Sequence, residues 1–432
     1  MIIDLSEFYL FIGQTKSHLD RLRQSNFARN AAWLLVLNLL SRGIGFFGTA
    51  YAMRCLGPVN VGISALIQAT VQQVALSFNC GFDMIAVRRI AADRSHTSVV
   101  TTTAVTFRLA LAVIASLIWV IVCNLVISES QRWVWLLGAP IMIASAGSIA
   151  FVFSGLEKLP IQNAIGTGGV LLSAIAYFVF FRPDMFLGAD LIVISIIGLT
   201  TMGVSWWVYH RLFGFWPIGR VVVQQLLLLF RESWRYWLLA VVVFFYSVFQ
   251  FPLIAYLLGP HELGIFRSAF VLAAGVELIF NSINSLLLAR LVNWQKMGLG
   301  VMWHRQTKLL LVFMIIGLPI VGILIFAAPI IYSLFLGNAF KEGVQIFQIL
   351  VVGRLVVFLG QIYAWGLVAV RQDNQFLFAS LLGAISSITM NLIVIPKYGI
   401  VGAAIVNVAS ESLLVTACFL FVRRHIMQAR AC

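Results

Sequence analysis

Charged and amide side chains lie inside long apolar stretches of this sequence, where an ionised group is costly unless it faces a cavity or a partner. In the first stretch Arg42 follows Asn38 by four residues, so both lie on one face of a helix. In the eighth stretch Arg267 precedes Glu277, and Asn281 follows Glu277 by four residues. A guanidinium donates two hydrogen bonds to one anion and keeps its charge. These residues therefore predict a site for an anionic, phosphate-containing group.

Glutamine side chains extend the same pattern to neighbouring stretches. Gln68 and Gln72 lie four residues apart in the second stretch, and Gln250 lies in the seventh, just before Pro252, a predicted kink. The first two stretches of each half of the chain thus carry an arginine and amides. We expect these four helices to line one central cavity.

Two further charged residues leave more than one interpretation open. Arg354, in the tenth stretch, is as compatible with a place in the cavity as with a structural role, and Arg108 is expected to extend to the lipid headgroups. For Arg42 and Arg267 the alternative is a structural ion pair, with Glu277 as a candidate partner.

Two carboxyl groups are candidates for ion coupling. Glu277 and Glu411 lie inside apolar stretches, where a carboxyl group can take up and release a proton. Glu411 also follows Asn407 by four residues, so a salt bridge or a packing role is an equally open interpretation.

The composition of the chain indicates that these residues belong to a membrane protein. The chain is 61% apolar and 10% charged, with a mean hydropathy of +1.00, whereas soluble domains average roughly 45–50% apolar and about 25% charged. A membrane-spanning helix needs about 20 largely apolar residues. By that measure the predicted spans are 31–53, 60–82, 100–127, 133–154, 161–181, 190–210, 233–257, 263–289, 308–333, 343–369, 375–395 and 400–422. The predicted fold class is an all-α integral membrane protein with about twelve transmembrane helices.

The basic residues predict how this protein is oriented. Twenty of its 29 lysine and arginine residues fall between spans on one side of the predicted topology and five on the other. The positive-inside rule then places both termini in the cytoplasm. It also explains the net charge of +14 without nucleic-acid binding. The largest predicted outer loop, 182–190, is short and holds Asp184 and Asp190, the only outer-loop aspartates.

A repeated sequence divides the chain. LGPVNVG at 56–62 and LGPHELG at 258–264 each join two predicted spans, and they lie about half the chain apart. The predicted organisation is therefore, in chain order, a cytoplasmic segment 1–30, a six-helix N-lobe 31–210, a linker 211–232 with an interfacial helix at 221–232, a six-helix C-lobe 233–422 and a cytoplasmic tail 423–432. Membrane proteins built from two like halves most often transport by moving one half against the other around a central site.

Chemistry of other kinds has little support in the sequence. Histidine and cysteine residues show no metal-ligand or nucleophile spacing, so we expect no catalytic residues, no metal and no cofactor. A membrane polymerase or ligase is the least favoured alternative, because such enzymes usually need an acidic residue on a sizeable outer loop.

Several short segments carry a family resemblance through their order along the chain. They are Asn30–Asn38, RCLGP at 54–58 with Gly62, GF at 81–82, RRIA at 88–91, GLEK at 155–158, and IPKYG at 395–399 with GAA at 402–404. Together, over residues 26–425, they resemble the oligosaccharide flippases of bacterial polysaccharide synthesis. These flippases are part of the multidrug/oligosaccharidyl-lipid/polysaccharide exporter superfamily.

The resemblance implies both an architecture and a substrate. It implies two lobes of six helices with a central cavity, in the cytoplasmic (inner) membrane. The implied substrate is an undecaprenyl-diphosphate-linked oligosaccharide for O-antigen, exopolysaccharide or capsule, with a polysaccharide polymerase and a chain-length regulator as partners. Arg42 and Arg267 would then meet the diphosphate. A drug or small-molecule exporter of the same superfamily is the alternative, and it would need unpaired carboxylates in the cavity.

Overall fold

The computed structural model describes residues 26–284 and 287–431, and every regular element in this part of the chain is a helix. Helices suit apolar segments in lipid because each satisfies its own backbone hydrogen bonds. The N-terminal bundle holds α3 (Phe82–Ala92), the short 3-10 helix η1 (Arg94–His96), α4 (Thr97–Val126), α5 (Glu129–Leu136), α6 (Gly138–Ala146), α7 (Ala150–Gly155), α8 (Leu159–Phe180) and α9 (Ala189–Phe213). The C-terminal bundle holds α13 (Leu287–Lys296), α14 (Leu299–Phe335), the 3-10 helix η2 (Asn338–Phe340), α15 (Gly343–Ala369) and α16 (Asp373–Ala431).

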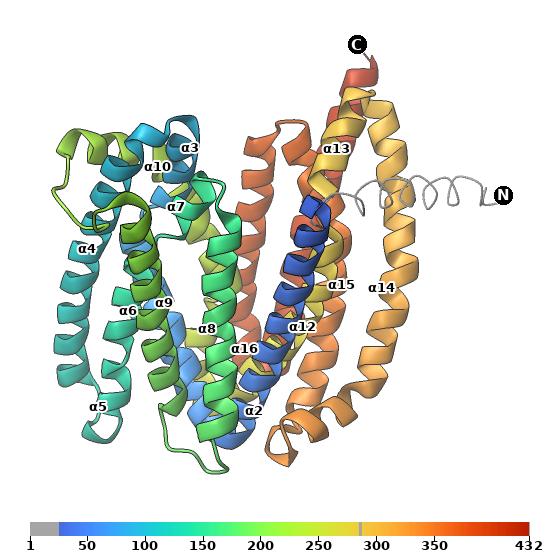
Figure 1. Cartoon of the computed structure of the whole chain (residues 1–432). Coiled ribbons are helices and arrows are strands. Elements are labelled where there is room, and N and C mark those ends of the chain that lie inside the picture. Colours follow the sequence, from blue (N-terminus) through green and yellow to red (C-terminus); the bar gives the residue numbers. More distant parts are fainter. Residues whose placement is uncertain (1–25, 285–286, 432) are drawn as a thin grey trace.

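Four helices connect the two bundles. These are α2 (Asn26–Asn79), α10 (Val223–Ser247), α11 (Gln250–Leu258) and α12 (Pro260–Asn284). Figure 1 shows the bundles diverging toward the end where the C-terminus lies, which we call the terminal end. At the opposite end, where α2 folds back on itself, α2 and the C-terminal bundle come together. We call this the closed end.

Eight helical segments in the described residues are long and apolar enough to cross a membrane. Two of them, Ser41–Asn79 and Asn374–Gln428, contain breaks at Gly57 and Gly399, and each is long enough for two crossings. The remaining predicted spans correspond to α10 with α11, and to α12. The prediction of an all-helical, multi-pass membrane protein is confirmed.

The repeated LGP sequence forms the same turn twice. Gly57 has φ 74° and ψ 166°, and Gly259 has φ 95° and ψ 172°. Both lie at positive φ, where a residue with a Cβ is strained and glycine is not. Each turn joins the first transmembrane helix of its half to the second, as the sequence predicts.

Helix α10 differs in detail from the prediction. The interfacial helix expected at 221–232 is the beginning of one continuous helix, Val223–Ser247, and the break falls at Val248 and Phe249. Pro252 lies in the first turn of α11, four residues after Val248, whose carbonyl its ring would meet in a continuous helix, so the kink predicted at Pro252 is present as this break. The assignment of 211–232 as the linker between lobes stays a prediction.

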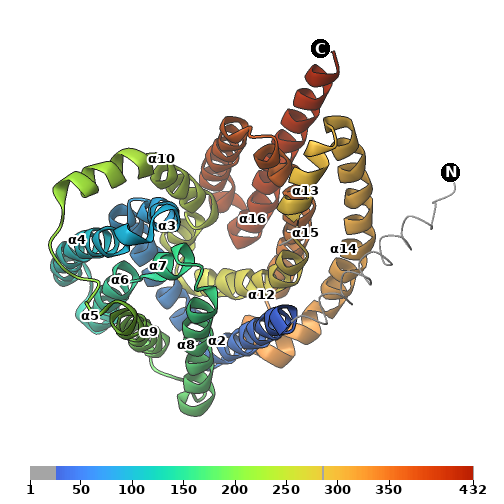
Figure 2. The same ribbon diagram turned by 45° about the horizontal axis from the view of Figure 1, so that its top comes forward.

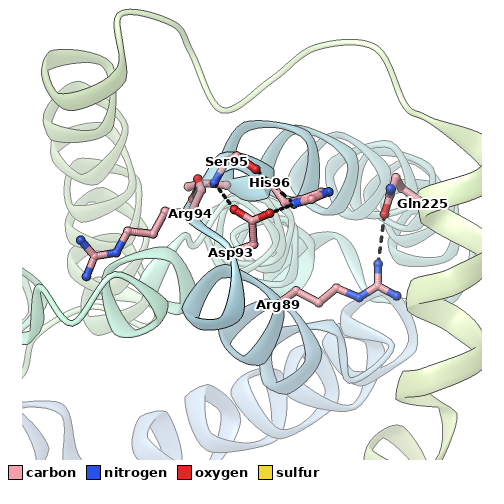
Figure 3. A network of polar contacts seen from close by, with 7 residues as sticks. Arg89, Asp93, Arg94, Ser95, His96 and Gln225 are labelled. Carbon is pink, nitrogen blue, oxygen red and sulfur yellow. Dashed lines mark hydrogen bonds and ion pairs between the residues drawn. The ribbon is translucent and has the colours of Figure 1, made fainter.

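Helix α10 also contacts both bundles at the terminal end (Figure 2). The Arg89 guanidinium of α3 donates to Glu232 at 2.9 Å and to Gln225 at 3.0 Å, the second bond being drawn in Figure 3. Phe230 packs on Phe82 of the same bundle, while other parts of α10 contact α16. The hydrogen bond from Arg89 lowers the pKa of Glu232 below its ordinary value.

A local cap fixes the connection between α3 and α4. The Asp93 carboxylate accepts a hydrogen bond from the backbone N–H of Ser95 at 2.8 Å and lies 2.9 Å from the Nδ1 atom of His96 (Figure 3). These contacts, those of Ser95 first, hold the pKa of Asp93 below its ordinary value. The turn therefore carries a negative charge beside the basic residues of the terminal end.

Candidate functional site

A cavity of about 530 Å³ lies between the halves of the molecule, within the range of roughly 300–1,000 Å³ usual for ligand sites. It is lined by both limbs of α2, by α8 and α9 of the N-terminal bundle, and by α12. Arg42 and Gln68 come from the two limbs of α2, and Arg267 comes from α12. The structure thus brings three of the predicted residues to one central cavity.

The charges in this cavity are unequal. Its charged residues, among those that the structure describes, are Arg42, Arg267 and Asp190. Arg42 is exposed, whereas Arg267 is half-buried and its guanidinium lies 5.4 Å from the centre of the Phe251 ring. Two positive charges against one negative charge give the cavity a positive potential, which low-dielectric walls strengthen.

The sequence prediction missed Asp190. The sequence predicts an outer-loop position for it, but the structure places it in the first turn of α9, with only 8% of its surface exposed. Ser64 of α2 donates a hydrogen bond to its carboxylate at 2.7 Å, and the charge of Arg267 acts on it across the interface between the halves. An aspartate that follows Gly188 and precedes an apolar run is a helix-start signal, and it could have located this residue.

The other predicted site residues lie elsewhere. Gln72 is exposed and Gln250 is buried, with no hydrogen-bond partner for its amide among the described residues, and neither lines this cavity. Glu411 is half-buried on α16. The side chains of Asn38 and Asn281 lie outside the described part of the structure.

Arg354 has a partner in the C-terminal half. Its guanidinium lies 3.4 Å from the carboxylate of Glu277 and 4.9 Å from the centre of the Phe270 ring. Glu277, the candidate partner of Arg42 or Arg267, thus pairs with Arg354, whereas the charge that acts on Arg267 is that of Asp190. Arg354 is mostly enclosed, with 10% of its side chain exposed, against 34% for Glu277.

Removing only the acidic partner of this pair should destabilise the protein strongly. Glu277→Leu leaves the Arg354 charge buried without compensation, and breaking a buried pair costs about 3–5 kcal/mol. Because a third of Glu277 is exposed, we expect the free energy of unfolding to fall by the lower end of this range, about 3 kcal/mol. The measurement is the midpoint of thermal unfolding in detergent, which should fall with it. Glu277→Leu combined with Arg354→Met should recover most of the loss. A double variant no more stable than the single variant would contradict this assignment.

The position of Arg108 also differs from the prediction. It does not extend to the headgroups: its side chain is 3% exposed, and it donates to Asp83 at 2.8 Å and to the Ser145 carbonyl at 3.4 Å. The pair joins α4 to α3 inside the N-terminal bundle. Helical spacing along one stretch could not reveal this partner, because Asp83 lies on another helix.

The two halves meet at the closed end through a reciprocal contact. A Cβ atom at Gly62 would overlap the carbonyl oxygen of Pro260, and a Cβ at Gly264 would overlap that of Pro58. Each LGP turn therefore packs its proline carbonyl on the glycine four residues after the proline of the other copy. Glycine is required at both positions because no larger residue admits this approach.

A polar bond adds to the reciprocal contact. Arg54 of α2 donates a hydrogen bond to the carbonyl of Leu334 in α14 at 3.0 Å. Nearby, the rings of Phe47 and Phe335 lie 5.4 Å apart, also across the two halves. Together these contacts close the cavity at the end where α2 folds back.

Comparison with known sequences gives the family. Residues 27–289 match the family described as polysaccharide biosynthesis protein, which is more than half of the chain. The chain belongs to the polysaccharide biosynthesis protein family. A relative in Escherichia coli (strain K12) is named as an O-antigen transporter. It is 21% identical to this chain over 412 residues, which cover 92% of this chain and 97% of the relative.

Solved structures share the fold of this family member. The lipid II flippase MurJ, in an inward closed conformation, superposes with a TM-score of 0.75 at 12% identity, covering 91% of this chain and 87% of MurJ. A multidrug resistance transporter of the MATE family, in an inward-facing conformation, gives a TM-score of 0.69 at 12% identity, covering 90% and 95%. At such low identity the likeness establishes the fold and leaves the substrate open.

Proposed function

We propose that the chain is a flippase that moves an undecaprenyl-diphosphate-linked oligosaccharide across the cytoplasmic membrane for the synthesis of O-antigen, exopolysaccharide or capsule. The observation that carries this proposal is the convergence of Arg42 and Arg267, one from each half, in a central cavity that is closed at one end. The names of the Escherichia coli relative and of MurJ, as an O-antigen transporter and a lipid II flippase, support the same assignment.

A diphosphate fits the charge of this cavity. Each guanidinium can donate a pair of hydrogen bonds to one phosphate, and charge-assisted bonds are roughly twice as strong as neutral ones. Arg42 is on the first helix of one half and Arg267 on the second helix of the other. A ligand that contacts both would couple the two halves, as alternating access requires.

The orientation follows from the basic residues. Most of them lie on the side of the predicted topology that carries both termini, so the terminal end faces the cytoplasm and the closed end faces outward. In the proposed orientation the end that opens between the bundles faces the cytoplasm, so the cavity can take the lipid headgroup from the inner leaflet. A polysaccharide polymerase and a chain-length regulator would act on the product on the outer side. Glu277 and Glu411 stay candidates for ion coupling.

Export of drugs or other small molecules is the second candidate, favoured by the likeness to the MATE transporter. Most such compounds that carry a charge are cations, and a cavity with two arginines and one aspartate repels them. The lipid-linked anion therefore fits the described residues better. A polymerase or ligase is disfavoured, because the described outer segments hold no sizeable loop.

Transport by purified protein in proteoliposomes separates these candidates. We expect translocation of a fluorescent undecaprenyl-diphosphate-linked oligosaccharide, measured by the loss of its accessibility to a membrane-impermeant quencher. A cationic dye loaded into the same vesicles should stay inside. Efflux of the dye without movement of the lipid would contradict the flippase assignment and favour the exporter. Restoration of surface glycan in a strain that lacks its flippase gives the corresponding test in cells.

A further inference from the structure

A second cavity of about 590 Å³ opens beside the central one, inside the N-terminal bundle. We call it the side cavity; its walls come mainly from α6, α7, α8 and α9, which are neighbours in the bundle (Figure 2). The two cavities share four lining residues, Arg42, Val170, Ser173 and Ile194. A ligand held at Arg42 can therefore extend into both.

The lining of the side cavity differs in character from that of the central cavity. Its hydroxyl and amide side chains are those of Ser41, Ser148, Gln162, Asn163, Thr167, Ser173, Thr201 and Ser205. Among the described lining residues Arg42 is the only charged one, and none is acidic. A cation would find no counter-charge among these residues, and a polyprenyl chain would offer no hydrogen bond to the exposed amide of Asn163. The lining favours a neutral ligand that carries many hydroxyl groups.

The hydrogen-bonding state of these side chains makes them complementary to sugars. The hydroxyls of Ser173 and Ser205 donate to backbone carbonyls of their own helices, so their oxygens remain free to accept. Gln162 already accepts a hydrogen bond from Ser154 at 2.7 Å, which leaves its NH₂ group as a donor. Asn163 is exposed, and its side chain makes no hydrogen bond with the described part of the chain. Sugar hydroxyls both donate and accept, so they match both kinds of group.

We propose that the side cavity binds the sugar units next to the diphosphate, while the diphosphate itself stays between Arg42 and Arg267. This inference rests on the proposed function and adds a residue-level site for glycan selection. The side cavity would then decide which neutral sugars this flippase accepts, through contacts from Gln162, Asn163 and the helix hydroxyls. Arg42, at the junction of the cavities, would mark the boundary between the charged and the neutral parts of the ligand.

One glycine offers a selective way to fill the side cavity. Gly166 lines it, and a Cβ added there would meet no atom within 4 Å, so a leucine side chain can enter the cavity without displacing backbone. Gly168, two residues along the same helix, lines neither cavity, and its Cβ would also meet no atom within 4 Å. Gly168→Leu is therefore a matched control for Gly166→Leu.

The test is equilibrium binding to the full-length protein in nanodiscs, with two probes. One is undecaprenyl diphosphate, and the other is the undecaprenyl-diphosphate-linked oligosaccharide isolated from the cells that make this protein. Wild type should bind the glycosylated lipid about tenfold or more tightly than the bare lipid, the equivalent of two or three hydrogen bonds. Gly166→Leu should remove this preference and change binding of bare lipid by less than about twofold. Asn163→Ala should weaken only glycosylated-lipid binding, by about threefold to tenfold, and Gly168→Leu should resemble wild type.

Each other outcome is informative. If Gly166→Leu binds the glycosylated lipid as tightly as wild type, the sugars do not occupy the side cavity. An equal loss for both probes in Gly166→Leu and Asn163→Ala would also overturn the proposal, because it assigns these residues to the glycan alone. If wild type binds both lipids equally well, the flippase function stands and the side cavity has no role in glycan binding. If it binds neither, the proposed function itself fails, and this inference with it.

Discussion

Alanine in place of Gly62 or Gly264 should stop transport while leaving the protein folded. Each glycine lies against the proline carbonyl of the other LGP turn, and an added methyl group would overlap that oxygen. Overpacking of this kind costs about 1–3 kcal/mol, which shifts an equilibrium between two states about 5- to 150-fold. Because the overlap exists only when the closed end is shut, the cost falls on the state open to the terminal end.

The conformational shift can be measured beside the loss of transport. A single cysteine at Ala274, which lines the central cavity, in a background without other cysteines, reports which end is open through labelling by an impermeant maleimide. With Gly62→Ala or Gly264→Ala, labelling from the closed end should rise. Gly43→Ala is the matched control, because Gly43 lies on α2 and a Cβ there would meet no atom within 4 Å. Normal labelling and normal transport in both test variants would show that the reciprocal contact is dispensable.

Replacing Arg267 by alanine should reduce lipid translocation at least about tenfold, since a hydrogen bond to a charged group contributes about 1.5–3 kcal/mol. The change removes one of two positive charges and leaves Asp190 to balance Arg42, so the cavity loses its excess of positive charge. Arg267→Lys should retain part of the activity, because it keeps the charge but not the two-pronged donor. The measurement is the initial rate of translocation in proteoliposomes at equal protein density.

Two further variants control this result. Arg182→Ala removes an exposed arginine that lines neither cavity and should leave the rate unchanged. Asp190→Asn keeps the shape of the side chain but raises the net charge of the cavity, so binding of the lipid diphosphate should be retained or strengthened. Full activity of Arg267→Ala, at wild-type protein levels, would remove Arg267 from the proposed diphosphate site.

The helical architecture could be predicted from the sequence, because a segment that crosses lipid must be apolar, long enough to span and able to satisfy its own backbone hydrogen bonds. The lengths of the apolar segments predicted the membrane-spanning helices, and the repeated LGP sequence predicted two like halves. The similar backbone angles of Gly57 and Gly259 agree with this repeat. Helical spacing also identified Arg42 and Gln68 as members of a polar face. Those two residues do line the central cavity, together with Arg267.

The sequence could not predict which helices face one another. Spacing along one helix gives the side on which a residue lies, but not its partner, so the pairs Arg108–Asp83 and Arg354–Glu277 appear only in the structure. Asp190 was missed for a related reason: it lies at the boundary of a loop and a helix, where hydropathy changes and assignment by composition is least certain. The side cavity was not predicted either, because its hydroxyl groups come from three separate helices, α2, α8 and α9, and from the segment between α6 and α7.

The reciprocal contact of the LGP turns has a consequence for how the halves relate. Gly62 contacts Pro260, and Gly264 contacts Pro58, which is the pattern that an isologous interface shows between the subunits of a symmetric dimer. Because both turns lie at the same end of the molecule, the two-fold axis runs along the membrane normal and not in its plane. The single chain thus has the geometry of two covalently joined subunits with the same orientation in the bilayer. The proposed lipid-linked glycan has no such symmetry, so its diphosphate can lie between the halves while its sugar units enter the side cavity, which belongs to the N-terminal bundle.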